Sequence, residues 1–130
     1  GKRTGPAEIE TLVCGTGKIA EVAAIGIPDA VKGQSVALIA VPMPGVKPSV
    51  QLEQELREAV VAGLGGAFRP SVIAFVAELP KTRNMKIMRR IVRAVYLGEA
   101  PGDLSSLVNP ETVDRLATLL RGVTAGQGSA

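Results

Sequence analysis

Three runs of apolar residues along the chain have the length and composition of buried strands. Residues 19–29 and 34–45 are rich in Val and Ile and are bounded by Gly and Pro. The run "SVIAFVAELP" at residues 71–80 has the same character. We therefore expect three strands that form one small sheet.

Four other segments space their apolar residues at helical intervals. Residues 6–14 begin with a Pro suited to a first helical turn, and residues 49–62 begin with Ser49 as the expected N-cap. Residues 84–97 and 109–120 each open with an Asn that can cap a helix. The order αββαβαα predicts an α+β fold, with a small, mainly three-stranded sheet covered by helices.

Composition narrows the chemistry that the chain can perform. It has 130 residues, 46% of them hydrophobic, which suits one domain with a single core. It has no His, which excludes Ser-His and Cys-His catalysis and most zinc sites. The single Cys14 cannot form an internal disulfide, and on the first predicted helix we expect it to be a small core residue.

Hydropathy argues against a membrane location. No stretch approaches the roughly 20 apolar residues that a membrane span needs, and the first residues do not resemble a signal peptide. We expect a cytoplasmic domain at residues 1–121 with a flexible, Gly-rich tail at residues 122–130. Because the chain opens on "GKRTGP" without an initiator Met, we expect it to be part of a longer protein.

Positive charge is concentrated in residues 81–93, which contain six Lys and Arg and no acidic residue. The whole chain has 15 cations and 12 anions, so the remainder has nine cations against 12 anions. On a helix that starts at Asn84, Lys86 would share one face with three Arg residues. This face can be a solvated or docking surface. Cations beside a helix start are otherwise unfavourable, which also suggests an anion-binding site. The six Lys and Arg residues of this segment are Lys81, Arg83, Lys86, Arg89, Arg90 and Arg93.

Two classes of anion fit such a cluster. One is a nucleic-acid backbone or an anionic membrane, which would make the domain a non-enzymatic binding module. The chain has only three aromatic residues, however, and its remaining surface is net acidic, which disfavours a long polyanion. We therefore favour a small phosphorylated ligand or an acidic pocket on another domain.

Other motifs carry less chemistry. "GTGKIA" at residues 15–20 matches a dinucleotide-binding string, but it follows a predicted helix and enters a predicted strand, the reverse of what that fingerprint requires. The pairs Glu8 with Glu10 and Glu53 with Glu55 fall on different sides of their helices. We interpret them as solvated faces.

The segment "PKTRNMKIMRRIVR" closely resembles "PKTRSGKIMRR" near the C-terminus of AMP-forming acyl-CoA synthetases, particularly the acetyl- and propionyl-CoA synthetase group. Three further stretches resemble this family in the same order, and the resemblance covers residues 1 to about 120. They are "GKRTGPAEIE", "VAAIGIPDAVKGQ" and "GDLSSLVNPETV".

This resemblance implies a two-step ligase. A carboxylic acid and ATP with Mg²⁺ would give an acyl-adenylate and pyrophosphate, and the thiol of coenzyme A would then displace AMP. The chain would be the small, mobile C-terminal domain, inactive by itself, and its partner would be its own N-terminal adenylation domain, which together with the hinge is absent. No nucleic acid or membrane would be bound. The substrate would be acetate, propionate or another short-chain acid, with a longer or aromatic acid as an alternative.

The resemblance also assigns residues. Lys86 matches the family's catalytic lysine, which reaches ATP and the substrate carboxylate, and Arg3 matches an arginine that contacts the nucleotide phosphate. Gly1 and Lys2 would border the tunnel for coenzyme A. An acetyltransferase and a deacetylase acting on Lys86 are further expected partners, because acetylation would remove the charge of this lysine.

Departures from the family pattern limit these assignments. Asn84 and Met85 replace the usual Ser-Gly before the lysine, which removes a residue tolerant of positive φ. Asn84 could supply that conformation or a helix cap instead. Val61 replaces an arginine that binds the nucleotide of coenzyme A, and a histidine near a bound cation is replaced around Thr16. We therefore expect no metal site in this domain.

Overall fold

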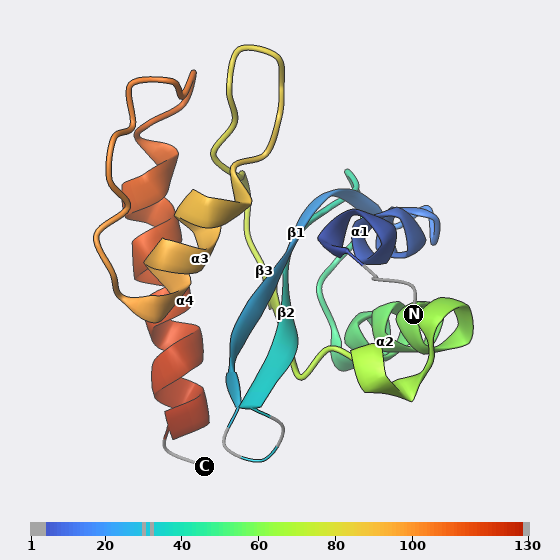
Figure 1. The fold of residues 1–130 in the computed structure, drawn as a ribbon. Helices are drawn as coiled ribbons and strands as arrows, with labels where there is room; N and C mark the ends of the chain where they lie inside the picture. Colours follow the sequence, from blue (N-terminus) through green and yellow to red (C-terminus); the bar gives the residue numbers. More distant parts are fainter. Residues whose placement is uncertain (1–4, 30, 32, 129–130) are drawn as a thin grey trace.

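The computed structural model describes residues 5–29, 31 and 33–128 and places them in an α+β fold (Figure 1). The predicted order αββαβαα is confirmed, with one additional 3₁₀ turn before the third strand. The strands are β1 Ile19–Asp29, β2 Gly33–Pro42 and β3 Val72–Phe75; the helices are α1 Pro6–Cys14, α2 Val50–Leu64, α3 Arg89–Leu97 and α4 Thr112–Gly128, and the 3₁₀ turn is η1 Gly66–Phe68.

The sheet has the order β1-β2-β3, so β2 lies in the centre. β1 and β2 form an antiparallel hairpin, whereas β3 pairs with β2 in parallel. The third strand is shorter than predicted, because it ends at Phe75 and the chain leaves the sheet after the bond from the Val76 N–H to the Ala40 carbonyl. Beyond the strand, Val76 and Leu79 are still buried, in the core that also contains side chains of α3 and α4.

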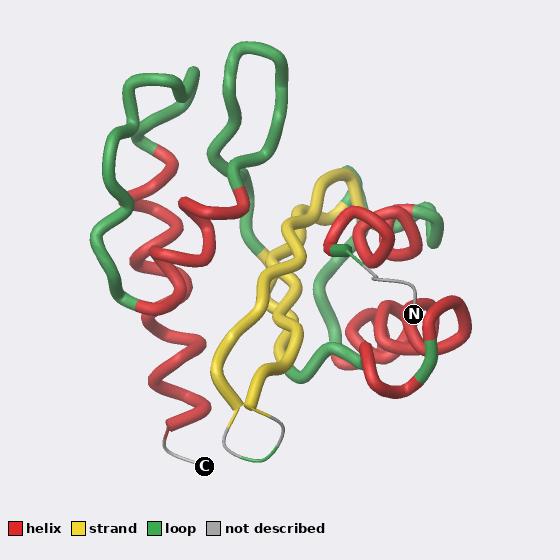
Figure 2. The backbone as a smooth tube through the Cα atoms, viewed as in Figure 1, coloured by secondary structure: helices red, strands yellow, loops and turns green. Residues whose placement is uncertain are grey.

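Helices cover both faces of the sheet (Figures 1 and 2). α1 and α2 lie on one face, and α3 and α4 lie on the other. Side chains of β1 alternate between the two cores, which explains why strands buried on both faces read as nearly continuous apolar runs. One core includes Ala23, Ile25, Ile27, Val92, Tyr96, Leu116 and Leu120, and the other includes Ile9, Val13, Val22, Leu38, Leu52, Leu56 and Val60.

The helix boundaries follow the sequence pattern unevenly. α2 is capped by Ser49 as predicted, since its hydroxyl accepts a bond of 3.0 Å from the Leu52 N–H. The third helix is shorter than predicted, because it starts at Arg89 and not at residue 84. α4 starts at Thr112 and continues to Gly128, past the expected end at residue 120. None of the described helices is long and apolar enough to cross a membrane.

Cys14 is exposed, so its prediction as a core residue was wrong. The buried positions of α1 are Ile9 and Val13, and the next residue along the helix turns away from that face. Partial burial, with the nearby carboxylates of Glu10 and Glu21, raises the pKa of the Cys14 thiol above its usual 9.0. The thiol is therefore protonated near neutral pH, and its reactivity is low.

Candidate active site

Lys86 lies in a long loop between β3 and α3, which extends beyond one end of the sheet (Figures 1 and 2). The tip of this loop closes as a tight turn. The Thr82 N–H donates to the Lys86 carbonyl at 3.0 Å, and the Met85 N–H donates to the Thr82 carbonyl at 2.8 Å. Lys81 and Ile87, on either side of the turn, form an antiparallel β-bridge. We call residues 82–86 the Lys86 turn. Lys86 is thus on a turn and not on the helix that the sequence predicted.

The backbone of the Lys86 turn explains the departure at Asn84 and Met85. Met85 has a φ of 63° and is the one non-glycine residue among those described with a positive φ. It adopts the conformation that the family's glycine would provide, at a cost of about 1–2 kcal/mol for an L-residue. Asn84 does not cap α3, because the N-cap position is Met88, which makes no side-chain cap bond.

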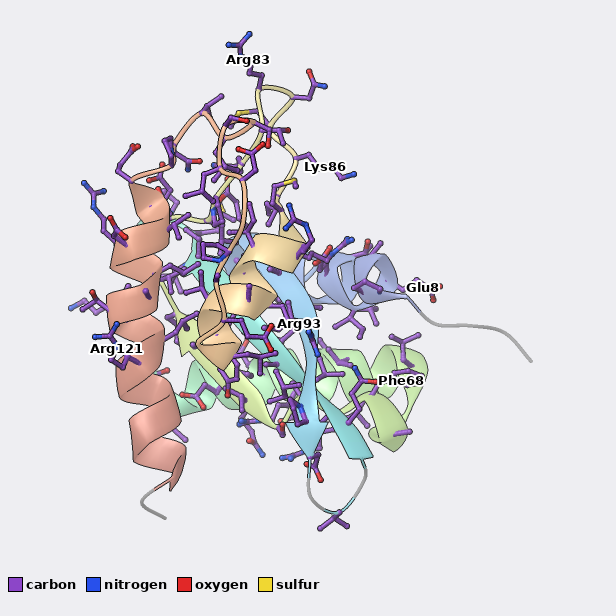
Figure 3. All side chains as sticks on the ribbon, turned by 60° about the vertical axis from the view of Figure 1, so that its left-hand side comes forward. Glu8, Phe68, Arg83, Lys86, Arg93 and Arg121 are labelled. Atoms are coloured by element: carbon purple, nitrogen blue, oxygen red, sulfur yellow. The ribbon has the colours of Figure 1, made fainter. Side chains whose placement is uncertain are left out.

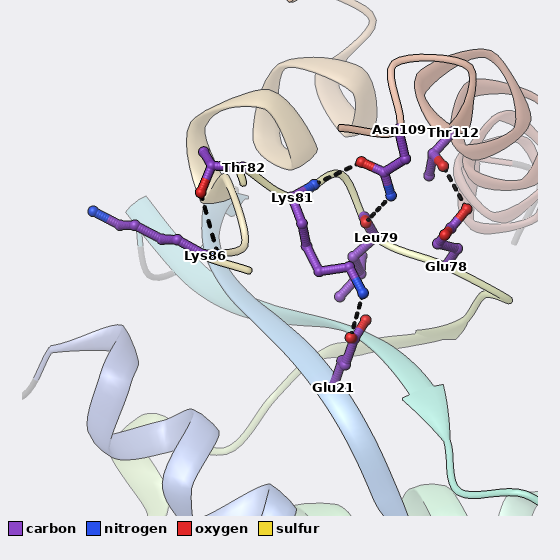
Figure 4. Close-up of polar contacts among 8 residues, drawn as sticks. All are labelled: Glu21, Glu78, Leu79, Lys81, Thr82, Lys86, Asn109 and Thr112. Atoms are coloured by element: carbon purple, nitrogen blue, oxygen red, sulfur yellow. Dashed lines mark hydrogen bonds and ion pairs between the residues drawn. The ribbon is translucent and has the colours of Figure 1, made fainter. Parts of the chain in front are cut away.

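The side chain of Lys86 is exposed and points away from the fold (Figures 3 and 4). In the described part of the chain its ammonium group has no hydrogen-bond or ion-pair partner, and neither has the guanidinium of Arg83 on the same turn. Two unpaired cations therefore project from the tip of a closed loop. Such an arrangement suits an anion supplied by another molecule or domain.

The other cations of this segment bond within the chain. Arg89 is half-buried and paired, which corrects the prediction of a solvated or docking face for this residue. The Lys81 ammonium lies 2.5 Å from a Glu21 carboxylate oxygen. Arg89 donates two bonds of 2.7 Å to Glu10, and these bonds raise the pKa of the Arg89 guanidinium. Arg93 donates to the Gly26 carbonyl at 2.8 Å. Arg90 and Arg93 match the prediction of a solvated face, because both are exposed; Arg90 makes a long bond of 3.4 Å to a backbone carbonyl.

Glu10 is also not the solvated residue that the sequence suggested. Besides its two bonds to Arg89, its carboxylate accepts a bond of 2.9 Å from the Ala24 N–H on β1. This bond and the Arg93 bond occupy the edge of β1 that does not pair with β2. Glu10 and Arg89 therefore join α1 to α3 around the edge of the sheet and hold the first turn of α3 in place.

A second group of polar contacts holds the base of the loop (Figure 4). Asn109 is buried and bonds the backbone of residues 79 and 81. Thr112 donates to a Glu78 carboxylate oxygen at 2.7 Å, and this bond is the main reason why the pKa of Glu78 is lowered. The sequence predicted a solvated Glu10 and a helix-capping Asn109 and assigned no role to Glu21, because the partners of all three residues are far away along the chain.

Other predicted positions are less informative. Gly1, Lys2 and Arg3 lie outside the described residues. Val61 is half-buried on α2 and lines a shallow groove with Arg57 and Arg69. Within residues 5–29, 31 and 33–128 no group of three or more Cys, Asp or Glu side chains is placed to hold a metal ion.

Comparison with known proteins identifies the family of this chain. Residues 8–86 match the family described as the AMP-binding enzyme C-terminal domain. The chain is 44% identical over 114 residues to the 3-hydroxypropionyl-coenzyme A synthetase of Sulfurisphaera tokodaii, covering 88% of this chain and 17% of that protein. It is 42% identical over 120 residues to the acetyl-coenzyme A synthetase of Methanothrix soehngenii, covering 92% and 18%.

Solved structures show the same fold. A Brucella canis acyl-CoA synthetase matches with a TM-score of 0.63 and 35% identity, over 68% of this chain and 16% of that one. The acetoacetyl-CoA synthetase from Streptomyces lividans matches with a TM-score of 0.78 and 21% identity, over 92% and 18%. The chain thus spans less than a fifth of the length of these relatives. With its family match over more than half of the chain, it belongs to the AMP-binding enzyme C-terminal domains and is a C-terminal domain of the AMP-forming acyl-CoA synthetase type.

Proposed function

We propose that this chain serves a longer AMP-forming acyl-CoA synthetase by supplying Lys86 as the catalytic lysine for acyl-adenylate formation. The observation that supports the proposal is the Lys86 ammonium at the tip of a closed turn, which has no partner among the described residues, whereas Lys81 and Arg89 are paired within the fold. A cation that such a turn presents to a bound substrate can stabilise negative charge as it develops in a transition state.

In the proposed first step, a carboxylate oxygen of the substrate attacks the α-phosphorus of ATP, and the bond to pyrophosphate breaks. The Lys86 ammonium would lie against the phosphate and carboxylate oxygens and offset their mutual repulsion. In the second step the thiol of coenzyme A attacks the acyl carbon and AMP leaves. Mg²⁺ would enter with ATP, held mainly by the N-terminal domain.

The finer assignments belong to the same proposal. Residues 1–121 would form the mobile domain, with residues 122–130 as its tail, in a cytoplasmic enzyme. Arg3 would contact the nucleotide phosphate, and Gly1 and Lys2 would border the tunnel for coenzyme A. The substrate would be a short-chain acid, as the similarity to the acetyl- and 3-hydroxypropionyl-coenzyme A synthetases suggests. Acetylation of Lys86 would remove its positive charge and stop the first step.

The test separates the two half-reactions in the full-length synthetase. Lys86→Ala should lower acid-dependent exchange between ATP and pyrophosphate by about 1,000-fold, the range lost when one preorganised charge partner is removed. Thioester formation from supplied acyl-AMP should change less than about threefold. Arg90→Ala is the matched control, since it removes an exposed cation of the neighbouring helix that lies outside the turn, and it should leave exchange nearly unchanged. Normal exchange in Lys86→Ala would refute the proposal.

The contacts in the folded structure give less support to the alternative function, a module that binds a polyanion. Lys81, Arg89 and Arg93 bond to Glu21, Glu10 and the β1 backbone, and Arg90 makes a long bond to the Pro101 carbonyl, so four of the six cations are engaged within the chain. Binding to nucleic acid or anionic vesicles that weakens steeply with salt would favour this alternative.

A further inference from the structure

Asn109 bonds twice to the strand-like segment that leads into the Lys86 turn (Figure 4). Its side-chain oxygen accepts from the Lys81 N–H at 2.9 Å, and its side-chain nitrogen donates to the Leu79 carbonyl at 2.9 Å. The side chain is 6% exposed, so these bonds do not compete with bulk water. A single carboxamide therefore takes the place of a neighbouring strand along residues 79–81.

Residues 107 and 108 continue this contact toward the turn. The Val108 N–H donates to the Lys81 carbonyl at 2.9 Å, and Leu107 forms an antiparallel bridge with Thr82. The segment needs such partners, because β3 has already ended at Phe75 and the sheet offers no further strand. The incoming side of the Lys86 turn is thus held by the chain that precedes α4.

Movement of Lys81 would be transmitted directly to Lys86. The turn closes on itself through the bond from the Thr82 N–H to the Lys86 carbonyl, and the Met88 N–H donates to the Pro80 carbonyl at 3.1 Å. The Lys86 ammonium has no partner of its own among the described residues that could hold it independently. Its place in space therefore depends on where residues 79–82 are held.

The family match ends at residue 86, so Asn109 lies in a part of the chain that this match does not include. The Thr112 N–H donates to the Asn109 backbone carbonyl, and Leu116 and Leu120 of α4 are buried against the sheet. The C-terminal segment is consequently anchored in the core at one end and bonded to the active-site loop at the other.

We propose that Asn109 is a positioning residue that holds the Lys86 turn in the geometry required for adenylate formation, an inference that rests on the proposed role of Lys86. Displacement of a reacting group by about 1 Å can lower a rate by about 100-fold. Loss of Asn109 should therefore impair the step that uses Lys86 and spare the step that does not.

The experiment uses the full-length synthetase and measures both half-reactions on each preparation. Asn109→Ala should lower kcat for ATP–pyrophosphate exchange by about 10- to 100-fold with little change in KM for ATP, since the binding groups are intact. Thioester formation from acyl-AMP should change less than about threefold, which also shows that the variant is folded. Asn109→Asp keeps the oxygen that accepts from the Lys81 N–H and should recover part of the lost exchange.

Ser35→Ala is the matched control, because it removes a part-buried hydrogen bond elsewhere in the fold, between Ser35 and Ser71, without touching residues 79–82. It should keep both half-reactions. Equal loss of the two half-reactions in Asn109→Ala and Asn109→Asp, or normal exchange in both, would overturn the inference. Normal exchange in Lys86→Ala would refute the proposed function. Normal exchange in the Asn109 variants, with exchange lost in Lys86→Ala, would refute only the positioning role of Asn109.

Discussion

The pair formed by Glu10 and Arg89 allows a quantitative test of how α3 is held. Glu10 accepts two bonds of 2.7 Å from Arg89 and one of 2.9 Å from the Ala24 N–H. Hydrogen bonds to charged groups contribute about 1.5–3 kcal/mol each where water is excluded. Here the side chains are 38% exposed for Arg89 and 17% for Glu10, so solvent screening reduces the value toward the exposed-pair range of about 0.2–1 kcal/mol.

We expect Arg89→Ala to lower the free energy of unfolding by about 1.5 kcal/mol. Glu10→Ala should cost about 2 kcal/mol, because it also removes the bond to the β1 backbone. The double variant should lose about 2.5 kcal/mol, which gives a coupling energy of about 1 kcal/mol. Urea unfolding of the four chains, followed by circular dichroism, measures all of these values.

The control is Glu8→Ala, which removes an exposed carboxylate from the same helix and should change stability by less than about 0.5 kcal/mol. Arg89→Lys should lose most of the coupling, because an ammonium group cannot form the two parallel bonds of a guanidinium. A coupling energy below about 0.3 kcal/mol, or a Glu10→Ala variant as stable as Glu8→Ala, would refute the view that this pair joins α1 to α3.

Two further predictions concern the loop. Met85→Gly should raise the free energy of unfolding by about 0.5–1 kcal/mol, because glycine adopts a φ of 63° without strain, and urea unfolding would contradict this if the variant were less stable. The lowered pKa of Glu78 means that the folded state favours its ionised form, so this contribution to stability is present above the usual 4.5 and is lost as the pH falls below it. Thr112→Val removes the main cause of that shift. The difference in free energy of unfolding between the wild-type chain and this variant should therefore shrink as the pH is lowered from 6 to 3.5. A difference that does not depend on pH would contradict the assignment.

The pattern of apolar residues was sufficient to predict the elements of the fold and their order. Strands buried on both faces and amphipathic helices leave a local signal, and a cap such as Ser49 acts within three residues of itself. The end of β3 had no such signal, because Val76 and Leu79 beyond it are buried in the same core as the residues of the strands. The start of α3 was misplaced for a related reason, since residues 81–88 form long-range and turn contacts in place of helical ones.

The candidate site could also be predicted only in part from the sequence. Lys86 could be identified from the motif that contains it, and the local arrangement of charge already suggested an anion. Which cations remain available to bind that anion could not be predicted, because Lys81 and Arg89 find carboxylates 60 and 79 residues away in the sequence. The burial of Cys14 could not be predicted either. Val13 is buried and Cys14, the next residue along α1, is exposed, and the local pattern does not distinguish the two positions.

The sequence by itself therefore determined the fold class, the family and the identity of the candidate lysine, all of which depend on residue types at short spacings. Tertiary structure decided that Lys86 lies on a turn, that Glu10, Glu21 and Asn109 support the loop around it, and that its ammonium has no partner among residues 5–29, 31 and 33–128. The physical reason is that a charged or buried polar side chain takes its partner from whatever the folded backbone brings within about 3 Å, and that proximity is not encoded in local pattern.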